Sequence, residues 1–148
     1  MGRTAIRSVV AAAWVYLASE CLVWWYPHYQ DEHPGVLAVH DLFNRALLGW
    51  QSEFGLFSGV LAFGLTAVAR AVPAGPTRSR VVLEIALALV LFTGIHLYVL
   101  FGSTSSESIG LGAVIGAVAA LAAAVFALVG ASVNLGETLP RLLRIDRL

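Results

Sequence analysis

The chain has 148 residues, of which 59% are hydrophobic and only 12% charged, and its formal net charge is zero. Soluble domains carry about 25% charged residues, so this composition excludes an ordinary soluble domain and indicates one all-α domain embedded in a lipid bilayer. The sequence has no basic run of the kind that binds phosphate backbones, so we expect no nucleic-acid partner.

Apolar segments predict the transmembrane helices in chain order. The first segment follows Arg3 and Arg7, as in a signal peptide, but it runs past the length of a signal sequence without a clear cleavage site, so we expect it to be retained. It ends at an aromatic cluster before Pro27, and a polar, His-rich connection at 28–45 follows. We predict one integral membrane domain over 1–148, a four-transmembrane-helix bundle with helices at about 6–26, 46–70, 81–101 and 109–133.

The positions of the arginines predict the orientation of this bundle. Eight of the nine basic residues, all of them arginine, lie at the N-terminus, after the second helix or in the C-terminal tail, and only Arg45 lies on the opposite side. Because positively charged loops stay in the cytoplasm, we expect a multi-pass cell-membrane protein with both termini cytoplasmic. The His-rich connection then faces outward, and the sequence does not indicate its role.

Three ionisable residues fall inside the predicted helices at similar depth. At about 1.5 Å per residue, Glu20, Glu53 and His96 lie about 8–10 Å inside the outward-facing ends, and Gln51 is two residues from Glu53. A carboxylate in hydrocarbon costs roughly 2.5–3.5 kcal/mol on insertion scales, so each group should face protein or water and have a partner. We therefore predict a shared ligand-binding site of Glu20, Gln51, Glu53 and His96.

Each of these residues also has a purely structural interpretation. Glu20 can reach water or hydrogen-bond to a nearby Ser or Trp, His96 can donate to a backbone carbonyl, and Glu53 can pair with Arg45. Glu84 is left out of the site because an arginine four residues earlier can pair with it. The shared site has the advantage that each residue then supplies a partner for the others.

The predicted site is compatible with more than one chemistry. Two carboxylates and an imidazole can bind a divalent metal with an open coordination position, with Glu53 and His96 as the metal ligands. The same groups can exchange protons or hydrogen-bond to the head group of a lipid or a quinone. The cofactor is therefore open between a divalent metal and a quinone, and no residue is assigned a catalytic role.

Small residues recur at four-residue spacing on two predicted helices. Such faces let helices approach closely, and we expect Gly59 and Gly116 to lie at helix–helix contacts. The same faces can instead dock on a second copy of the chain or on a larger membrane complex. The residues are Gly55 and Gly59 on the second helix and Gly112, Gly116, Ala120 and Ala124 on the fourth.

The run Trp50-Gln51-Ser52-Glu53-Phe54-Gly55, with the later Gly94-x-His96, resembles a pattern of the DoxX-like small four-helix membrane proteins. The resemblance covers roughly residues 45–100 and implies the four-helix fold. Its namesake resembles a subunit of quinone-linked sulfur oxidation, which implies a redox-linked accessory role. Glu20 and the His-rich connection depart from that pattern. The stretch from Trp14 to Glu20 is similar to the small multidrug transporters, whose helix-one glutamate exchanges protons for cations, but the rest of the chain does not continue that similarity.

Three functions follow from the sequence. The first is a membrane-embedded site that binds a metal ion or a small polar or quinone-like head group. The second is a proton-coupled transporter of small molecules, which would need polar groups leading to both faces of the membrane. The third is an accessory subunit that packs on a larger membrane complex.

Overall fold

The computed structural model describes residues 1–26, 47–101 and 108–145, so the predictions for the His-rich connection and for Arg45 lie outside the described residues. The described residues form four long helices, three short strands and one 3-10 turn. The helices are α1 (Arg3–Glu20), α3 (Glu53–Ala71), α4 (Pro76–Phe101) and α5 (Leu111–Ile145). Between them lie β1 (Val23–Tyr26), β2 (Leu47–Leu48), η1 (Gly49–Gln51) and β3 (Ser108–Ile109).

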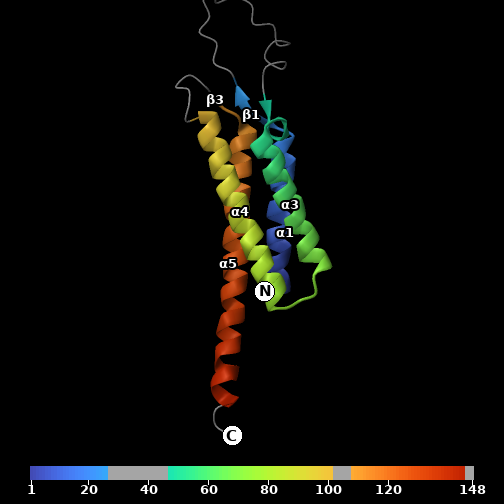
Figure 1. Ribbon diagram of the computed structural model, residues 1–148, viewed down its shortest axis with the longest axis vertical. Coiled ribbons are helices and arrows are strands. Elements are labelled where there is room, and N and C mark those ends of the chain that lie inside the picture. Colours follow the sequence, from blue (N-terminus) through green and yellow to red (C-terminus); the bar gives the residue numbers. More distant parts are fainter. Residues whose placement is uncertain (27–46, 102–107, 146–148) are drawn as a thin grey trace, which may run out of the picture.

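The four helices pack as a closed ring in which each helix has two neighbours. α1 contacts α3 and α5, and α4 also contacts α3 and α5. The strands form a sheet of order β2-β1-β3, with β1 antiparallel to both neighbours. This sheet lies at one end of the bundle, here named the sheet end, whereas the N-terminus, the α3–α4 turn and the last turns of α5 lie toward the other, the terminal end (Figure 1).

Helix boundaries differ from the prediction, most of all at the sheet end. α3 begins at Glu53 and not near residue 46, because Ser52 caps it and accepts a hydrogen bond from Gly55 N at 2.9 Å. α1 ends at Glu20 and not near residue 26, because the valine and the aromatic residues of β1 pair in the sheet. At the other end, α4 begins earlier than predicted, at Pro76, and α5 continues to Ile145.

The bundle has small residues inside and large apolar residues outside. Val60 and Leu91 are 62% and 61% exposed, and many other Leu, Val and Phe side chains also point outward. Small interior residues with a large apolar exterior are typical of helices that pack in lipid. Within the described residues, three helices are long and apolar enough to cross a membrane: Glu53–Ala71, Pro76–Val99 and Leu111–Ser132. The buried alanines are Ala12, Ala13, Ala62, Ala69, Ala86, Ala113, Ala119, Ala120, Ala123, Ala124 and Ala127.

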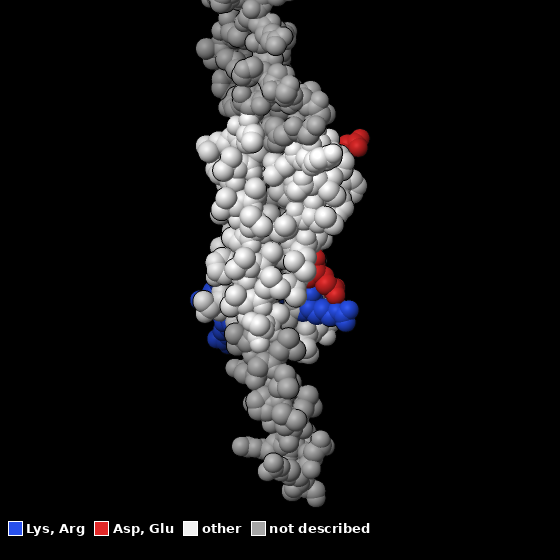
Figure 2. Space-filling view, turned by 90° about the vertical axis from the view of Figure 1, so that its left-hand side faces the viewer, with Lys and Arg blue, Asp and Glu red and all other residues white. Residues whose placement is uncertain are grey.

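Charged side chains gather at the ends of the bundle. On the face that Figure 2 shows, basic and acidic groups lie toward the terminal end and one acidic group lies at the sheet end, with an uncharged band between them. Arg80 Nε donates to Glu84 Oε1 at 2.7 Å, which confirms the pair expected from their spacing. The uncharged band coincides with the apolar lengths of the helices.

The two predicted glycine contacts have opposite outcomes. A Cβ atom on Gly116 would lie 2.5 Å from Trp24 Cζ2 and 2.8 Å from Ser19 Oγ, so this position packs directly against side chains of the α1–β1 segment. A Cβ atom on Gly59 would meet nothing within 4 Å, so the expectation that Gly59 lies at a close helix–helix contact is wrong. Equal spacing in the sequence therefore hides two different environments.

Candidate functional site

Buried polar side chains form a layer at the sheet end of the bundle. Below this layer the buried residues are apolar, apart from Thr66 and Ser79, in the part of the chain that the structure describes. The layer draws side chains from α1, α3 and α4, which lie far apart in the sequence. Its members are Tyr16, Ser19, Glu20, Ser58, Thr93 and His96.

Trp24 of β1 connects the elements that form this layer. Its side chain is 1% exposed, and its Nε1 donates to Ser19 O at 2.8 Å. The indole stacks on His96, with ring centroids 4.8 Å and planes 13° apart, and Tyr16 contacts it edge-on at 6.1 Å. Two glycines of α5 leave room for the indole. The Trp24 side chain thus contacts α1, α4 and α5 and connects them to the sheet.

His96 hydrogen-bonds to the residue that caps α3. Its Nε2 lies 2.7 Å from Ser52 Oγ, which also accepts from Gly55 N at 2.9 Å and lies 3.2 Å from Gly49 O. The hydroxyl has a single proton, and when that proton goes to the Gly49 carbonyl the imidazole must donate from Nε2. In that arrangement the buried Nδ1 is an acceptor without a partner among the described residues.

Glu20 is the last residue of α1 and is 4% exposed. Both carboxyl oxygens are buried, and neither has a hydrogen-bond partner among the residues that the structure describes. The Tyr16 hydroxyl, one turn earlier, lies near the carboxyl group and interacts with it, but it forms no hydrogen bond of good geometry with either oxygen. Glu20 Oε2 also lies so close to the backbone of Gly49 that a Cβ atom there would clash with it. A buried polar group without a partner costs about 1–3 kcal/mol or more, so Glu20 marks a place where a partner is missing.

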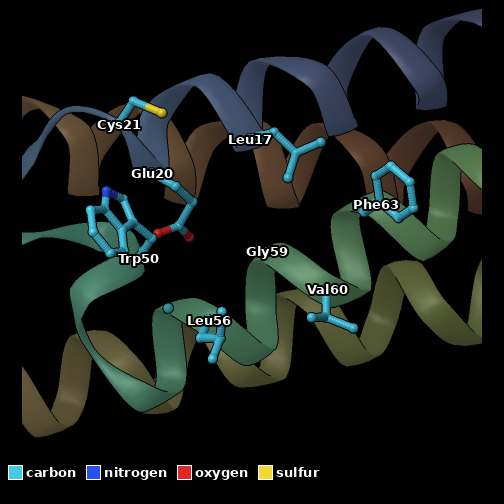
Figure 3. Close-up of a pocket in the computed structure, with 9 residues that line it drawn as sticks. Leu17, Glu20, Cys21, Trp50, Leu56, Gly59, Val60 and Phe63 are labelled. Carbon is cyan, nitrogen blue, oxygen red and sulfur yellow. The ribbon is translucent and has the colours of Figure 1, made fainter.

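A groove between α1 and α3 leads to Glu20. Its volume is about 360 Å³, and Figure 3 shows the Glu20 carboxyl group pointing from α1 toward Trp50 and α3, with Gly59 facing the same space. Cys21, which is exposed, lies at the same end of the groove. Apart from Glu20, Cys21 and Trp50, the wall consists of apolar residues and glycines: Leu17, Gly55, Leu56, Gly59, Val60 and Phe63.

Glu53 and Gln51 lie outside the buried layer. Glu53 is exposed in the first turn of α3, where a carboxylate interacts favourably with the helix dipole, so the expected depth of about 10 Å is wrong. Gln51 is also exposed, and its Oε1 accepts a hydrogen bond from Leu48 N at 2.8 Å. Among the described residues no group of three His, Cys, Asp or Glu side chains could hold a metal ion. The geometry therefore gives no support to a metal site at Glu53 and His96.

Glu20 and His96 belong to one layer but do not bond to each other. Within the described residues no hydrogen bond reaches either Glu20 oxygen, so none joins it to His96. Trp24 lies beside both residues. Its ring stacks on His96. Its Nε1 lies close to the backbone of Gly49, as Glu20 Oε2 does, since a Cβ atom on Gly49 would be within 2.6 Å of each. The sequence places these residues at similar depth but does not reveal the indole beside both.

Sequence reasoning missed Tyr16, Trp24 and Ser52 as parts of this layer. Tyr16 precedes Glu20 by four residues and so shares its face of α1, which is a signal that the helical period supplies. Ser52 is a residue type that commonly caps helices. Trp24 has no comparable signal, because it belongs to an aromatic cluster that by itself indicates only the membrane interface.

Comparisons with known proteins do not extend this description. No protein-family model matches the chain, and comparisons with curated proteins and with solved structures also give no match. The fold and its apolar spans therefore define the class of the protein, a helical bundle whose described part contains three helices long and apolar enough to cross a membrane. The resemblance to DoxX-like proteins receives no support from these comparisons and stays a hypothesis.

Proposed function

We propose that the protein is a multi-pass membrane protein whose sheet end binds the polar head group of a small lipid-soluble molecule at Glu20. The observation that supports this proposal is the buried carboxyl group of Glu20, whose two oxygens have no partner among the described residues and which borders an apolar groove. A ligand head group would supply the missing hydrogen bonds, and the groove would hold the apolar part of the ligand.

A head group agrees with the arrangement better than a metal ion does. With Glu53 exposed, Glu20 is the only carboxylate that the described residues place in the buried layer. An ionised Glu20 can accept hydrogen bonds from hydroxyl groups, and a protonated Glu20 can donate one to a carbonyl oxygen. A head group with hydroxyl donors, such as the reduced form of a quinone-like ring, suits an ionised Glu20, which keeps a redox-linked role among the proposals.

The other two proposed functions receive less support. A proton-coupled transporter needs polar groups that lead from Glu20 to the terminal end, but the buried hydroxyls described there, Thr66 and Ser79, each donate to a backbone carbonyl of their own helix region. Ser79 also accepts from the amino group of Met1, and the buried side chains around these groups are apolar. An accessory subunit would dock through exposed apolar faces, and lipid accounts for those faces equally well.

The proposed orientation has all four helices crossing the membrane and both termini in the cytoplasm. Cysteines in place of Gln51 at the sheet end and Thr77 at the terminal end, each in a Cys21→Ala background, can report it, because both side chains are exposed. We expect a membrane-impermeant maleimide to label the Gln51→Cys variant in intact cells and the Thr77→Cys variant only after the membrane is opened. Labelling with the opposite sidedness would overturn the orientation.

Glu20→Gln is expected to remove head-group binding while the protein still folds. Native mass spectrometry of protein released from lipid nanodiscs should show a retained small molecule on the wild type and a loss of at least about tenfold on the variant, since hydrogen bonds to charged groups contribute about 1.5–3 kcal/mol. The ligand-free variant should melt at the wild-type temperature or above it, because an amide is less costly to bury than a carboxylate.

Glu53→Gln is the matched control for this experiment, since it makes the same chemical change at an exposed carboxylate. It should retain the bound molecule and should lower stability by only about 0.3–1 kcal/mol through the lost interaction with the α3 dipole. Equal retention by wild-type and Glu20→Gln protein would contradict the proposed function.

A further inference from the structure

Resting on the proposed function, we infer the class of the ligand and its route: a single-chain amphiphile whose head group carries N–H or O–H donors, and which enters sideways from the lipid between α1 and α3. Gly59 is the residue that keeps the path of its chain open. This inference goes beyond head-group binding because it commits to the polarity of the head, the shape of the tail and the entrance.

The polarity of the head follows from what the groove offers. Glu20 presents two buried oxygens without partners, which donate no hydrogen bond when the carboxyl group is ionised and share a single O–H donor when it is protonated. Trp24 Nε1, which lies on the same side of Gly49, is already bonded to Ser19 O. Among the residues that line the groove, Trp50 and Cys21 are the other side chains with a polar hydrogen. The groove therefore offers more hydrogen-bond acceptors without partners than donors, so we expect the head group of the ligand to carry the N–H or O–H donors.

The shape of the tail follows from the wall along α3. From Leu56 to Phe63 this wall runs for about 10 Å at 1.5 Å per residue, with Gly59 and Val60 between them. A Cβ atom on Gly59 would meet nothing within 4 Å, and Gly59 faces the groove (Figure 3). A volume of about 360 Å³ is near the lower end of small-molecule sites, so it suits a slender chain better than a bulky ring system.

The entrance follows from the difference in exposure along the groove. Leu56, Val60 and Phe63 are 60–62% exposed, whereas the Glu20 side chain at the end of the groove is 4% exposed. Leu56, Val60 and Phe63 all belong to α3, one of the helices long and apolar enough to cross a membrane, so in a bilayer the open side of the groove faces lipid and not water. A molecule dissolved in the membrane can slide along α3 until its head reaches Glu20.

Four probes with the same decyl chain test the class of the ligand in nanodiscs by titration calorimetry, with empty nanodiscs subtracted. Decanol and decylammonium carry donors, decyltrimethylammonium carries charge without a donor, and decylbenzoquinone carries acceptors alone. We expect saturable binding of decanol, decylammonium or both, and binding of the other two that is weaker by at least about tenfold. The two donor probes distinguish a neutral head group from a charged one.

Two variants test the site and the route, and thermal melting verifies that each is folded. Glu20→Gln should weaken the binding of the donor probes by at least about tenfold. Gly59→Leu should weaken the binding of every probe by a similar factor, because the new leucine side chain enters the groove and leaves Glu20 unchanged. Gly94→Leu is the matched control on α4, since Gly94 also has an open Cβ position but does not line this groove.

The outcomes separate this inference from the proposed function. If decylbenzoquinone or decyltrimethylammonium binds as tightly as the donor probes and Glu20→Gln weakens it, the ligand class is wrong and head-group binding at Glu20 stands. If Gly59→Leu binds the probes like the wild type, the lateral route is wrong. If no probe distinguishes wild type from Glu20→Gln, both the inference and the proposed function fall.

Discussion

Trp24→Ala is expected to lower the free energy of unfolding by about 3–5 kcal/mol, the usual cost of removing a fully buried tryptophan side chain. The indole is 1% exposed and stacks on His96, so its loss would leave a cavity between α1, α4 and α5. The bond to Ser19 O would also be lost. Unfolding in mixed micelles with increasing denaturing detergent measures the change.

Two further variants separate the causes of that loss. Trp24→Phe keeps an aromatic ring on His96 but loses the indole hydrogen bond to Ser19 O, which still accepts from Leu22 N. We therefore expect an intermediate loss of stability, of which the missing bond accounts for about 0.5–1.5 kcal/mol. Trp50→Ala removes the same side chain at a position that is 52% exposed, and it should change stability by about 0.5 kcal/mol or less. Similar losses for Trp24→Ala and Trp50→Ala would mean that Trp24 does not connect the polar layer as described.

Hydropathy predicts the helical bundle well because lipid imposes one strong condition on every helix. Each segment must be apolar over about 20 residues, and in the described part of the chain three of the four predicted helices meet that condition, whereas α1 is not among them. The Arg80–Glu84 pair is equally predictable, since it depends only on helical spacing. Such features depend on neighbours in the sequence, and the structure confirms them.

The depth of Glu53 is not predictable in the same way. Residues 46–50, which precede it, are apolar, and a short apolar run does not distinguish the end of a helix from a strand. In the structure Leu47–Leu48 pairs with β1, and Ser52 then starts α3 just before Glu53. The strand partner comes from a segment more than twenty residues earlier, so a local pattern cannot show that the helix starts late. Glu20 is buried for the related reason that Gly49, in the same irregular segment, packs against it.

The candidate site could therefore be predicted from the sequence only in part. Glu20 and His96 are identifiable because an ionisable residue in an apolar segment needs a partner. The groove cannot be identified from the sequence, because it depends on which faces of α1 and α3 meet and on Gly59, whose Cβ position has no neighbour. Gly59 and Gly116 carry the same signal in the sequence, and only the packing of the four helices distinguishes them.

That distinction leads to the second large effect, the contrast between Gly116→Leu and Gly59→Leu. Both changes replace a helical glycine by a better helix former, which by itself favours the folded state by roughly 0.5–1 kcal/mol. At Gly116 the new side chain must displace Trp24 and Ser19, since even a Cβ atom would lie 2.5 Å from the indole. Overpacking of this kind costs about 1–3 kcal/mol, and because the indole is held on several sides we expect a loss at the upper end of that range.

At Gly59 the side chain would enter the groove, where a Cβ atom meets nothing within 4 Å, so the gain in helix propensity should remain. Gly59→Leu protein is therefore expected to melt at the wild-type temperature or slightly above it, and Gly116→Leu protein well below it. Gly116→Ala gives a graded comparison, because it adds only the Cβ atom that already contacts Trp24. If Gly116→Leu melts like the wild type, α5 does not press against Trp24, and the packing that places Glu20 beside the groove is wrong. If Gly59→Leu is instead the destabilised variant, α1 and α3 meet where the structure has an opening, and no groove exists there for a ligand to enter.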